Sequence, residues 1–125
     1  MRTIAMHQIT EHVKQSVIDI NYHLDESLVN LFRKAKANET NKTASAILDD
    51  LIVNQDIAAK GDVPLCQDTG LVVVYVEIGR DVHLDGDLYQ AINDGVRAGY
   101  DEGYLRKSVV NHPFQRTNTG DNTPA

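Results

Sequence analysis

Apolar side chains recur at helical spacing near the start of the chain. From Ile9, the apolar positions Val13, Val17 and Ile20 follow one another every three or four residues, which places them on one face of a helix. Charged residues fall between them on the other faces. The pattern therefore predicts an amphipathic helix that ends near Tyr22.

Two further helices are expected before residue 61. Asp25 can accept hydrogen bonds from the free amides of a first turn, so it predicts the start of the second helix. A third and longer helix, capped by Thr40 or Asn41, is expected to run to Lys60 and to stop at Gly61. The apolar positions that we expect to be buried in the second helix are Leu28, Leu31, Phe32 and Ala35.

The pattern changes after residues 61–64. The run from Leu71 to Ile78 is apolar and rich in β-branched residues, and glycines bound it on both sides, so it predicts a buried strand. Residues 81–84 are the only candidate for a partner strand. This shortage suggests that the sheet is completed by other residues or by another copy of the chain, because an unpaired edge favours association.

A fourth helix is expected after the turn at residues 85–87, with Asp87 as its cap. Gly95 and Gly99 lie four residues apart in it, on one face, and predict close packing of another element there. From Ser108 onward the periodicity is lost and loops are expected. The predicted fold class is α+β, with an N-terminal helical bundle, a small β-sheet and a further helix in a single domain over residues 1–125.

Composition and charge exclude several classes of protein. The chain has 125 residues, with 18 acidic and 12 basic side chains and a formal net charge of -6, which counts against a nucleic-acid surface. The longest apolar run is far shorter than the roughly 20 residues of a membrane helix, and no signal peptide is recognised, so a cytoplasmic location is expected. The single cysteine, Cys66, cannot form an internal disulfide. The five histidines are interpreted as surface residues.

The segment from Pro64 to Gly70, with the sequence PLCQDTG, is the best candidate for chemistry. It crowds a thiol and polar side chains into one loop, where they could face a ligand. The alternative is structural: Cys66 would be a small buried hydrophobe, Asp68 and Thr69 would satisfy turn amides, and Gly70 would be a left-handed turn residue. From the chain alone, residues 117–123 are interpreted as a solvated loop or a frayed tail.

Three motifs resemble the N-terminal part of class I, iron-sulfur-dependent fumarate hydratases, specifically the alpha subunit of the two-subunit form. They are PLCQDTG followed by LVVVYVEIG, the segment LRKSVV at residues 105–110, and NTGDNTPA at residues 118–125. They occur in the order and at the separation of that family. His112 departs from the family, since many relatives carry an acidic residue there, and this puts the local loop contacts in doubt.

The resemblance implies roles for four residues. Cys66 would be one of three cysteine ligands of a [4Fe-4S] cluster, in which the fourth iron binds substrate. Gln67 and Asp68 would contact substrate, and Asp68 is the candidate proton donor or acceptor. Arg106 would clamp a substrate carboxylate, although from the residues alone it is equally well a helix-end arginine facing the carbonyl dipole. The run at residues 118–125 would form a loop near the active site.

The resemblance also implies partners and a substrate. The reaction would be the reversible hydration of fumarate to L-malate, and we expect the chain to be an N-terminal piece of a longer alpha subunit, inactive alone, that works with a beta subunit in a homo- or hetero-oligomer. Neither nucleic acid nor membrane is an expected partner. Two alternatives stay open: an L-tartrate dehydratase alpha subunit, and a non-catalytic regulatory or assembly domain with Cys66 as a redox-sensitive thiol.

Overall fold

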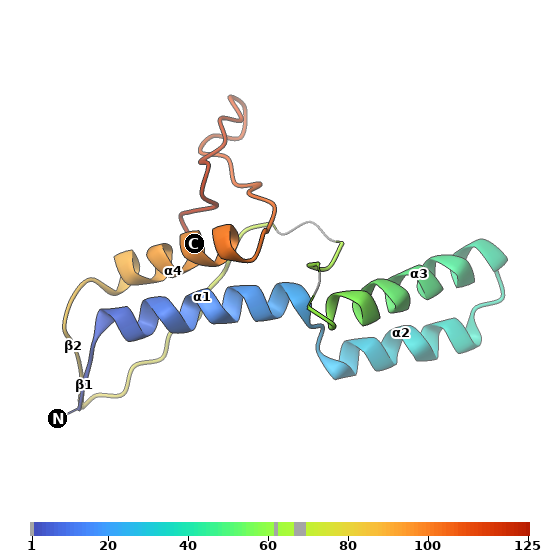
Figure 1. Cartoon of the computed structure of the whole chain (residues 1–125), viewed down its shortest axis with the longest axis horizontal. Helices are drawn as coiled ribbons and strands as arrows, with labels where there is room; N and C mark the ends of the chain where they lie inside the picture. Colours follow the sequence, from blue (N-terminus) through green and yellow to red (C-terminus); the bar gives the residue numbers. More distant parts are fainter. Residues whose placement is uncertain (1, 62, 67–69) are drawn as a thin grey trace. The chain divides into compact units, whose positions relative to one another are not determined.

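Helices account for most of the regular structure in residues 2–61, 63–66 and 70–125, which are the residues that the computed structural model describes (Figure 1). In chain order the elements are β1 (Arg2–Ile4), α1 (Met6–Tyr22), α2 (Glu26–Asn38), α3 (Lys42–Ala58), β2 (Val82–Leu84) and α4 (Leu88–Glu102). Helices together with a small sheet confirm the predicted α+β class. Within these described ranges, no helix is long and apolar enough to cross a membrane.

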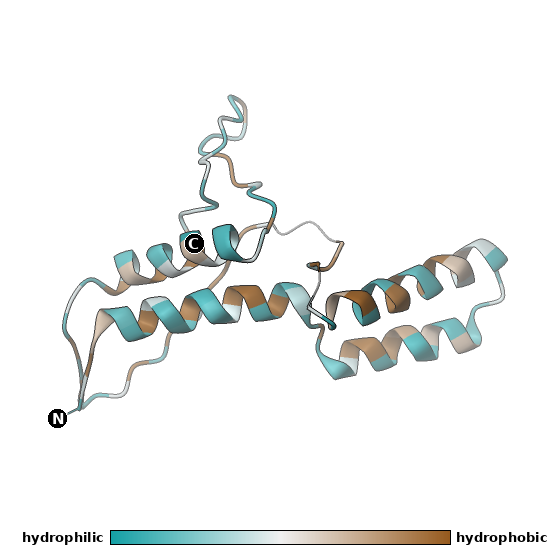
Figure 2. Ribbon diagram, viewed as in Figure 1, coloured by the Kyte–Doolittle hydropathy of each residue, from teal (hydrophilic) through white to brown (hydrophobic). Residues whose placement is uncertain are grey.

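The chain divides into two compact units. The first unit comprises Met1–Ile18 and Asp68–Ala125, and the second comprises Asp19–Gln67. The single domain predicted for residues 1–125 stays a prediction. Figure 2 shows that hydrophobic and hydrophilic residues alternate around the helices of both units, as expected of amphipathic helices.

Asx side chains start the two helices of the second unit, as the sequence predicts. The Asp25 carboxylate accepts a hydrogen bond from the Ser27 amide at 2.8 Å and begins α2. Asn41 Oδ1 accepts from the amides of Thr43 and Ala44, at 2.9 and 3.2 Å, and begins α3. α3 ends at Ala58, two residues before the predicted Lys60, and the predicted stop residue, Gly61, follows in a turn with a φ of 84°, a conformation that favours glycine.

The predicted buried stripe of α2 is wrong in its main members. Leu28 and Leu31 are 38% and 58% exposed, whereas the buried residue of α2 is Val29. The two helices of the second unit pack side by side, and α3 contributes the fully buried Ala58. Helical spacing identifies the apolar side of a helix, but the packing of the neighbouring helix decides which residues on that side are buried.

In the first unit, α1 and α4 approach each other through the predicted glycine face. A Cβ atom on Gly95 would lie 2.6 Å from the carbonyl oxygen of Thr10, and one on Gly99 would lie 3.0 Å from that of Lys14. The Thr10 hydroxyl donates a hydrogen bond to the carbonyl of Ala91 at 3.1 Å across the same contact. The core of this unit includes Val17, Val96 and Tyr100, each at most 3% exposed.

The sheet differs from the predicted one. β1 and β2 pair in parallel, with Arg2 opposite Val82 and Ile4 opposite Leu84. Residues 82–84 therefore form a strand as expected, but their partner lies at the N-terminus and not in residues 71–78. The Asp85 carboxylate accepts a hydrogen bond from the Met6 amide at 2.8 Å and so caps α1, which begins three residues before the predicted Ile9.

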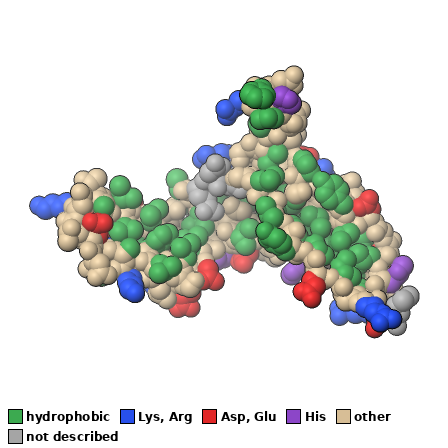
Figure 3. All heavy atoms as spheres, turned by 180° about the vertical axis from the view of Figure 1, so that it is seen from behind, with side chains coloured by type: hydrophobic (Ala, Val, Ile, Leu, Met, Phe, Trp, Pro, Cys, Tyr) green, Lys and Arg blue, Asp and Glu red, His purple; other side chains and the backbone are tan. Residues whose placement is uncertain are grey.

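The run at residues 71–78 is not a strand, so this prediction is wrong. None of the backbone hydrogen bonds between described residues involves it, and a β-branched apolar run forms a strand only against a partner. Its side chains are largely exposed, with Val73 at 64% and Tyr75 at 94%. Figure 3 shows that hydrophobic side chains are also exposed elsewhere on the surface of each unit.

Candidate active site

Two asparagines fix the backbone that leads into the PLCQDTG motif. The Leu65 amide donates to the carbonyl of Asn21 at 2.8 Å, and the Cys66 amide donates to Asn54 Oδ1 at 3.1 Å. Leu65 is only 6% exposed, whereas the Cys66 thiol is free and exposed. The interpretation of Cys66 as a buried hydrophobe is therefore wrong, and its backbone is held while its side chain stays accessible to a ligand.

The other two predicted residues of this motif, Gln67 and Asp68, lie outside the described residues. Gly70 closes the motif with a φ of 54°, the left-handed conformation expected of a turn glycine. Its carbonyl oxygen accepts a hydrogen bond from the side-chain amide of Asn122 at 3.1 Å, across 52 positions of sequence. The end of PLCQDTG is thus tied to the third motif, NTGDNTPA.

Asn122 also binds the second motif, LRKSVV. Its Oδ1 accepts from the backbone amides of Ser108 and Val109, at 2.8 and 2.9 Å, and its side chain is fully buried. One side chain therefore joins all three motifs. The interpretation of residues 117–123 as a solvated loop or frayed tail is wrong at Asn122. Its side chain is buried and makes hydrogen bonds with residues distant in sequence.

An open recess of about 310 Å³ lies where these motifs meet, and we call it the motif recess. It is lined by Gly70, Leu71, Ser108, Val109 and Val110. Its walls come from the end of PLCQDTG and from LRKSVV, the same two segments that Asn122 joins. Its volume lies at the lower end of the usual range for ligand pockets, roughly 300–1,000 Å³.

Asp121 fixes the neighbouring part of NTGDNTPA. Its carboxylate accepts from Arg97 Nε of α4 at 2.8 Å, and from the amide and hydroxyl of Thr123 at 3.0 and 2.7 Å. These hydrogen bonds, first from Thr123 and then from Arg97, lower the pKa of the Asp121 carboxyl to about 2. At the chain end, the Ala125 amide donates to the side chain of buried Asn93 at 2.9 Å.

Arg106 follows the end of α4 in the first unit. The preceding Leu105 is buried, and its amide donates to the carbonyl of Tyr100 at 3.0 Å, which fixes the backbone as it leaves the helix. Arg106 itself is exposed, two residues before the Ser108 amide that Asn122 binds. Cys66 belongs to the second unit, so the structure describes Arg106 and Cys66 each within its own unit.

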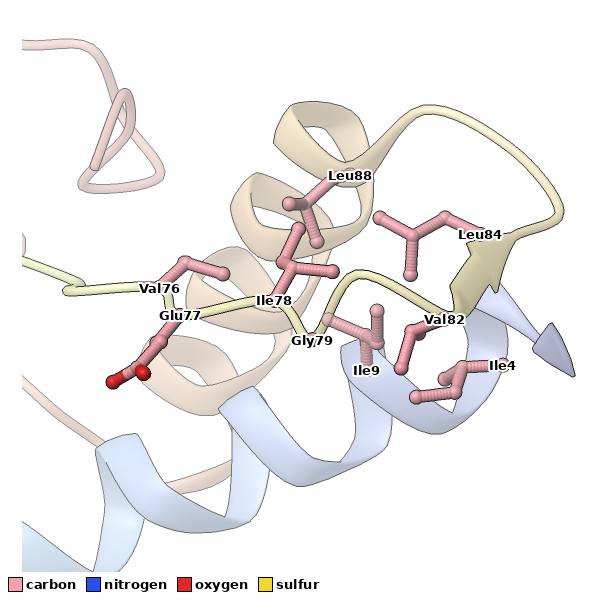
Figure 4. Close-up of a pocket in the computed structure, with 9 residues that line it drawn as sticks. All are labelled: Ile4, Ile9, Val76, Glu77, Ile78, Gly79, Val82, Leu84 and Leu88. Atoms are coloured by element: carbon pink, nitrogen blue, oxygen red, sulfur yellow. The ribbon is translucent and has the colours of Figure 1, made fainter. Parts of the chain in front are cut away.

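A second pocket, of about 190 Å³, has an unsuitable lining for a dicarboxylate. Figure 4 shows aliphatic side chains converging on it from β1, β2 and the starts of α1 and α4, while the Glu77 carboxylate points away. Its lining is aliphatic apart from Gly79 and Glu77, so an anionic ligand placed there would lose its hydration without a polar partner. The lining residues are Ile4, Ile9, Val76, Glu77, Ile78, Gly79, Val82, Leu84 and Leu88.

All five histidines are exposed, which confirms their interpretation as surface residues. His23 nevertheless has a carboxylate partner that the sequence analysis missed, because its Nδ1 lies 3.0 Å from Asp19 Oδ1 one helical turn earlier. In the part of the chain that the structure describes, no three His, Cys, Asp or Glu residues are grouped as metal ligands. Cys66 is the only thiol that the sequence offers.

Sequence reasoning missed Asn122 and Arg97 as organising residues. Asp94 lies three residues before Arg97, a spacing that indicates an ion pair on a helix. Arg97 Nη1 lies 2.6 Å from Asp94 Oδ1. The contact between Arg97 and Asp121 spans 24 positions and leaves no such signal. For Asn122, the positive φ of 61° suits asparagine, but only the folded chain shows what its side chain binds.

Comparison with known proteins gives a consistent family. The model of the fumarate hydratase (Fumerase) family matches residues 10–125. A protein named putative L(+)-tartrate dehydratase subunit alpha, from Methanocaldococcus jannaschii, is 32% identical over 94% of this chain and 43% of its own length. The aerobic class I fumarate hydratase of Escherichia coli K12 is 32% identical over 98% of this chain and 23% of its own length.

A third relative, the L(+)-tartrate dehydratase subunit alpha of Escherichia coli K12, is 28% identical over 95% of this chain and 39% of its own length. The chain therefore spans less than half the length of these curated relatives. The family model covers almost the whole chain, including the three motifs that meet at Asn122. The chain belongs to the fumarate hydratase family.

Proposed function

We propose that this chain forms part of a hydro-lyase that reversibly adds water to fumarate and gives L-malate. The observation that carries the proposal is the meeting of PLCQDTG, LRKSVV and NTGDNTPA at Asn122, beside the motif recess. Dehydration of L-tartrate is the second candidate, because two of the relatives above are named as tartrate dehydratase subunits. The NTGDNTPA ending resembles the fumarase side more, and this favours fumarate.

The reaction needs an activated hydroxyl, a proton delivered to the adjacent carbon and stabilisation of the charge that develops on a carboxylate. Asp68 is proposed to deliver or accept the proton, and Gln67 to orient the substrate. Arg106 is proposed to bind a substrate carboxylate, for which a planar guanidinium offers parallel donors. Arg106 precedes by two residues Ser108, which lines the motif recess, and this nearness in sequence supports the proposal.

Cys66 fits the role of a ligand to a [4Fe-4S] cluster. Its thiol is exposed on a backbone held by Asn54, and thiolate is the ligand that such clusters select. A bound cluster would supply a Lewis-acidic iron for the substrate hydroxyl and carboxylate. A cluster with three cysteine ligands needs two thiolates beyond the one in this sequence, so we propose that further polypeptide supplies them.

Assembly with such polypeptide is supported by residues 71–78. This segment combines exposed apolar side chains with a backbone that makes no hydrogen bond to other described backbone, a combination that favours pairing with another strand. The tartrate dehydratase relatives are named as alpha subunits, and a beta subunit is therefore the proposed partner. Light scattering of the active enzyme should give a mass above that of one chain, and an active monomer would contradict this.

Substrate assays of the complete enzyme, together with a measurement of its bound iron, test the proposed function. Formation of L-malate from fumarate, at a kcat/KM well above that for L-tartrate dehydration, is the expected result. A preference for tartrate would favour the second candidate. Hydration or dehydration of neither substrate, together with a reactive thiol and no bound iron, would favour a regulatory domain with a redox-sensitive Cys66.

A further inference from the structure

The side chain of Asn122 connects the two walls of the motif recess. On one side its Nδ2 donates to the Gly70 carbonyl at 3.1 Å, and on the other its Oδ1 accepts from Ser108 and Val109 at 2.8 and 2.9 Å. The side chain is fully buried, so water does not compete for these bonds. The connection joins segments that are nearly forty positions apart in sequence.

Only an amide satisfies this arrangement. The carbonyl oxygen has two lone pairs for the two backbone amides, and the NH₂ group supplies the donor for Gly70. An ionised aspartate would have the same shape and could accept from Ser108 and Val109, but it would face the Gly70 carbonyl without a donor. A buried acceptor facing another acceptor is costly.

The backbone around Asn122 is itself held in place. Asp121, directly before it, is bound to Arg97 of α4 at 2.8 Å, and Ala125, three residues later, is bound to the side chain of Asn93 in the same helix. Hydrogen bonds to α4 therefore hold both ends of the short segment, residues 121–125, that carries Asn122. A shift of this segment against α4 would break these hydrogen bonds. The position of Asn122, and of the two walls that it joins, is therefore fixed relative to α4.

We propose that Asn122 is a positioning residue for the hydration reaction. Through Gly70 on one side, and through Ser108 and Val109 on the other, it joins the two walls of the motif recess and so sets the spacing between them. This inference rests on the proposed function and adds a residue that does not itself line the recess. A misplacement of about 1 Å in a reacting site can cost about 100-fold in rate.

The test compares Asn122→Asp and Asn122→Gly in the complete, iron-loaded enzyme. Asn122→Asp removes the donor without changing the shape, and Asn122→Gly removes the side chain while allowing the positive φ. At neutral pH both should lower kcat/KM for fumarate by about 10- to 100-fold, with most of the loss in kcat. Iron content should stay that of the unchanged enzyme, because no cluster ligand is altered.

The pH profile separates positioning from a general loss of structure. When the new carboxyl of Asn122→Asp is protonated, it offers a donor to Gly70 again while its other oxygen still accepts from Ser108 and Val109. Relative to the unchanged enzyme at each pH, this variant should recover activity on acidification, and Asn122→Gly should not. Asn111→Asp is the control for the added charge, because Asn111 is exposed and directly follows LRKSVV. It should show neither the loss of kcat/KM at neutral pH nor the recovery of activity on acidification.

A second readout does not depend on activity. Asn122→Gly should speed hydrogen exchange at the Ser108 and Val109 amides of the chain, whereas Asn111→Asp should not. Unchanged exchange, or an active Asn122→Asp enzyme with unaltered kcat/KM, would overturn the proposal while leaving the proposed function intact. Equal recovery of both Asn122 variants at low pH would also overturn it. An unchanged enzyme that neither hydrates fumarate nor dehydrates L-tartrate would instead contradict the proposed function itself.

Discussion

A Cβ atom on Gly95 would lie 2.6 Å from the carbonyl oxygen of Thr10, closer than real Cβ atoms approach a backbone oxygen. It would also lie 2.8 Å from the Val13 Cβ atom. The absence of a side chain at Gly95 therefore sets how closely α4, the helix that LRKSVV follows, packs on α1.

Gly95→Ala should lower the free energy of unfolding. Overpacking of a close helix contact costs about 1–3 kcal/mol, and the better helix propensity of alanine, about 1 kcal/mol, offsets only part of this. Gly99→Ala, with its nearest contact at 3.0 Å, should cost less. Urea unfolding followed by circular dichroism measures both.

Gly79→Ala provides the control for this pair, since its Cβ would meet Val82 at an ordinary 3.6 Å. Its free energy of unfolding should change by less than about 0.5 kcal/mol. A Gly95→Ala chain as stable as the Gly79→Ala chain would show that α1 and α4 do not pack through this glycine.

Asp121 should contribute a stability that acid removes. The pKa of its carboxyl is about 2 in the folded chain against 3.8 as the ordinary value, so the folded state favours the ionised form. Its contribution is present above about pH 5 and is lost as the pH falls toward about 2. The difference in free energy of unfolding between the unchanged chain and Asp121→Asn should shrink over this range.

Asp101→Asn is the matched comparison, because Asp101 also pairs with a cation, Lys107, but is 57% exposed. An exposed pair is worth at most about 1 kcal/mol, so the Asp101→Asn chain should differ little from the unchanged chain at any pH. If Asp121→Asn and Asp101→Asn gave the same acid profile, the pairing of Asp121 with Arg97 and Thr123 would be refuted.

Removal of the Asn41 cap should destabilise the start of α3. Asn41→Ala leaves the first-turn amides of Thr43 and Ala44 without their side-chain acceptor, and the expected loss is about 1 kcal/mol. Helical circular dichroism during thermal unfolding measures it. Asn38→Ala changes an exposed asparagine at the end of α2 and should have a smaller effect, so equal losses would argue against the cap.

Local chemistry made much of this fold predictable. Asp25, Asn41 and Asp87 start their helices because an Asx side chain reaches amides two or three residues ahead, which the sequence shows directly. Gly95 and Gly99 indicated a close contact because their four-residue spacing puts them on one helix face. These predictions needed no knowledge of the partner.

Predictions that depended on a distant partner failed. Residues 71–78 have the composition of a strand, yet the described sheet joins Arg2–Ile4 to Val82–Leu84 across about eighty positions. The start of α1 depends on Asp85 in the same way. In the candidate site, the sequence motifs indicated Cys66 and Arg106, whereas the role of Asn122 depends on bonds to Gly70, Ser108 and Val109 that no local pattern encodes.

We expect this chain to supply a cluster ligand to a hydro-lyase, and the iron content of the Cys66→Ser variant of the complete enzyme tests this role. Serine keeps the size of the side chain but removes the thiolate, so bound iron and malate formation should both be lost. The comparison is Arg106→Ala, which should retain iron while raising KM for fumarate. Iron content in Cys66→Ser equal to that of the unchanged enzyme would refute the role of Cys66 as a cluster ligand.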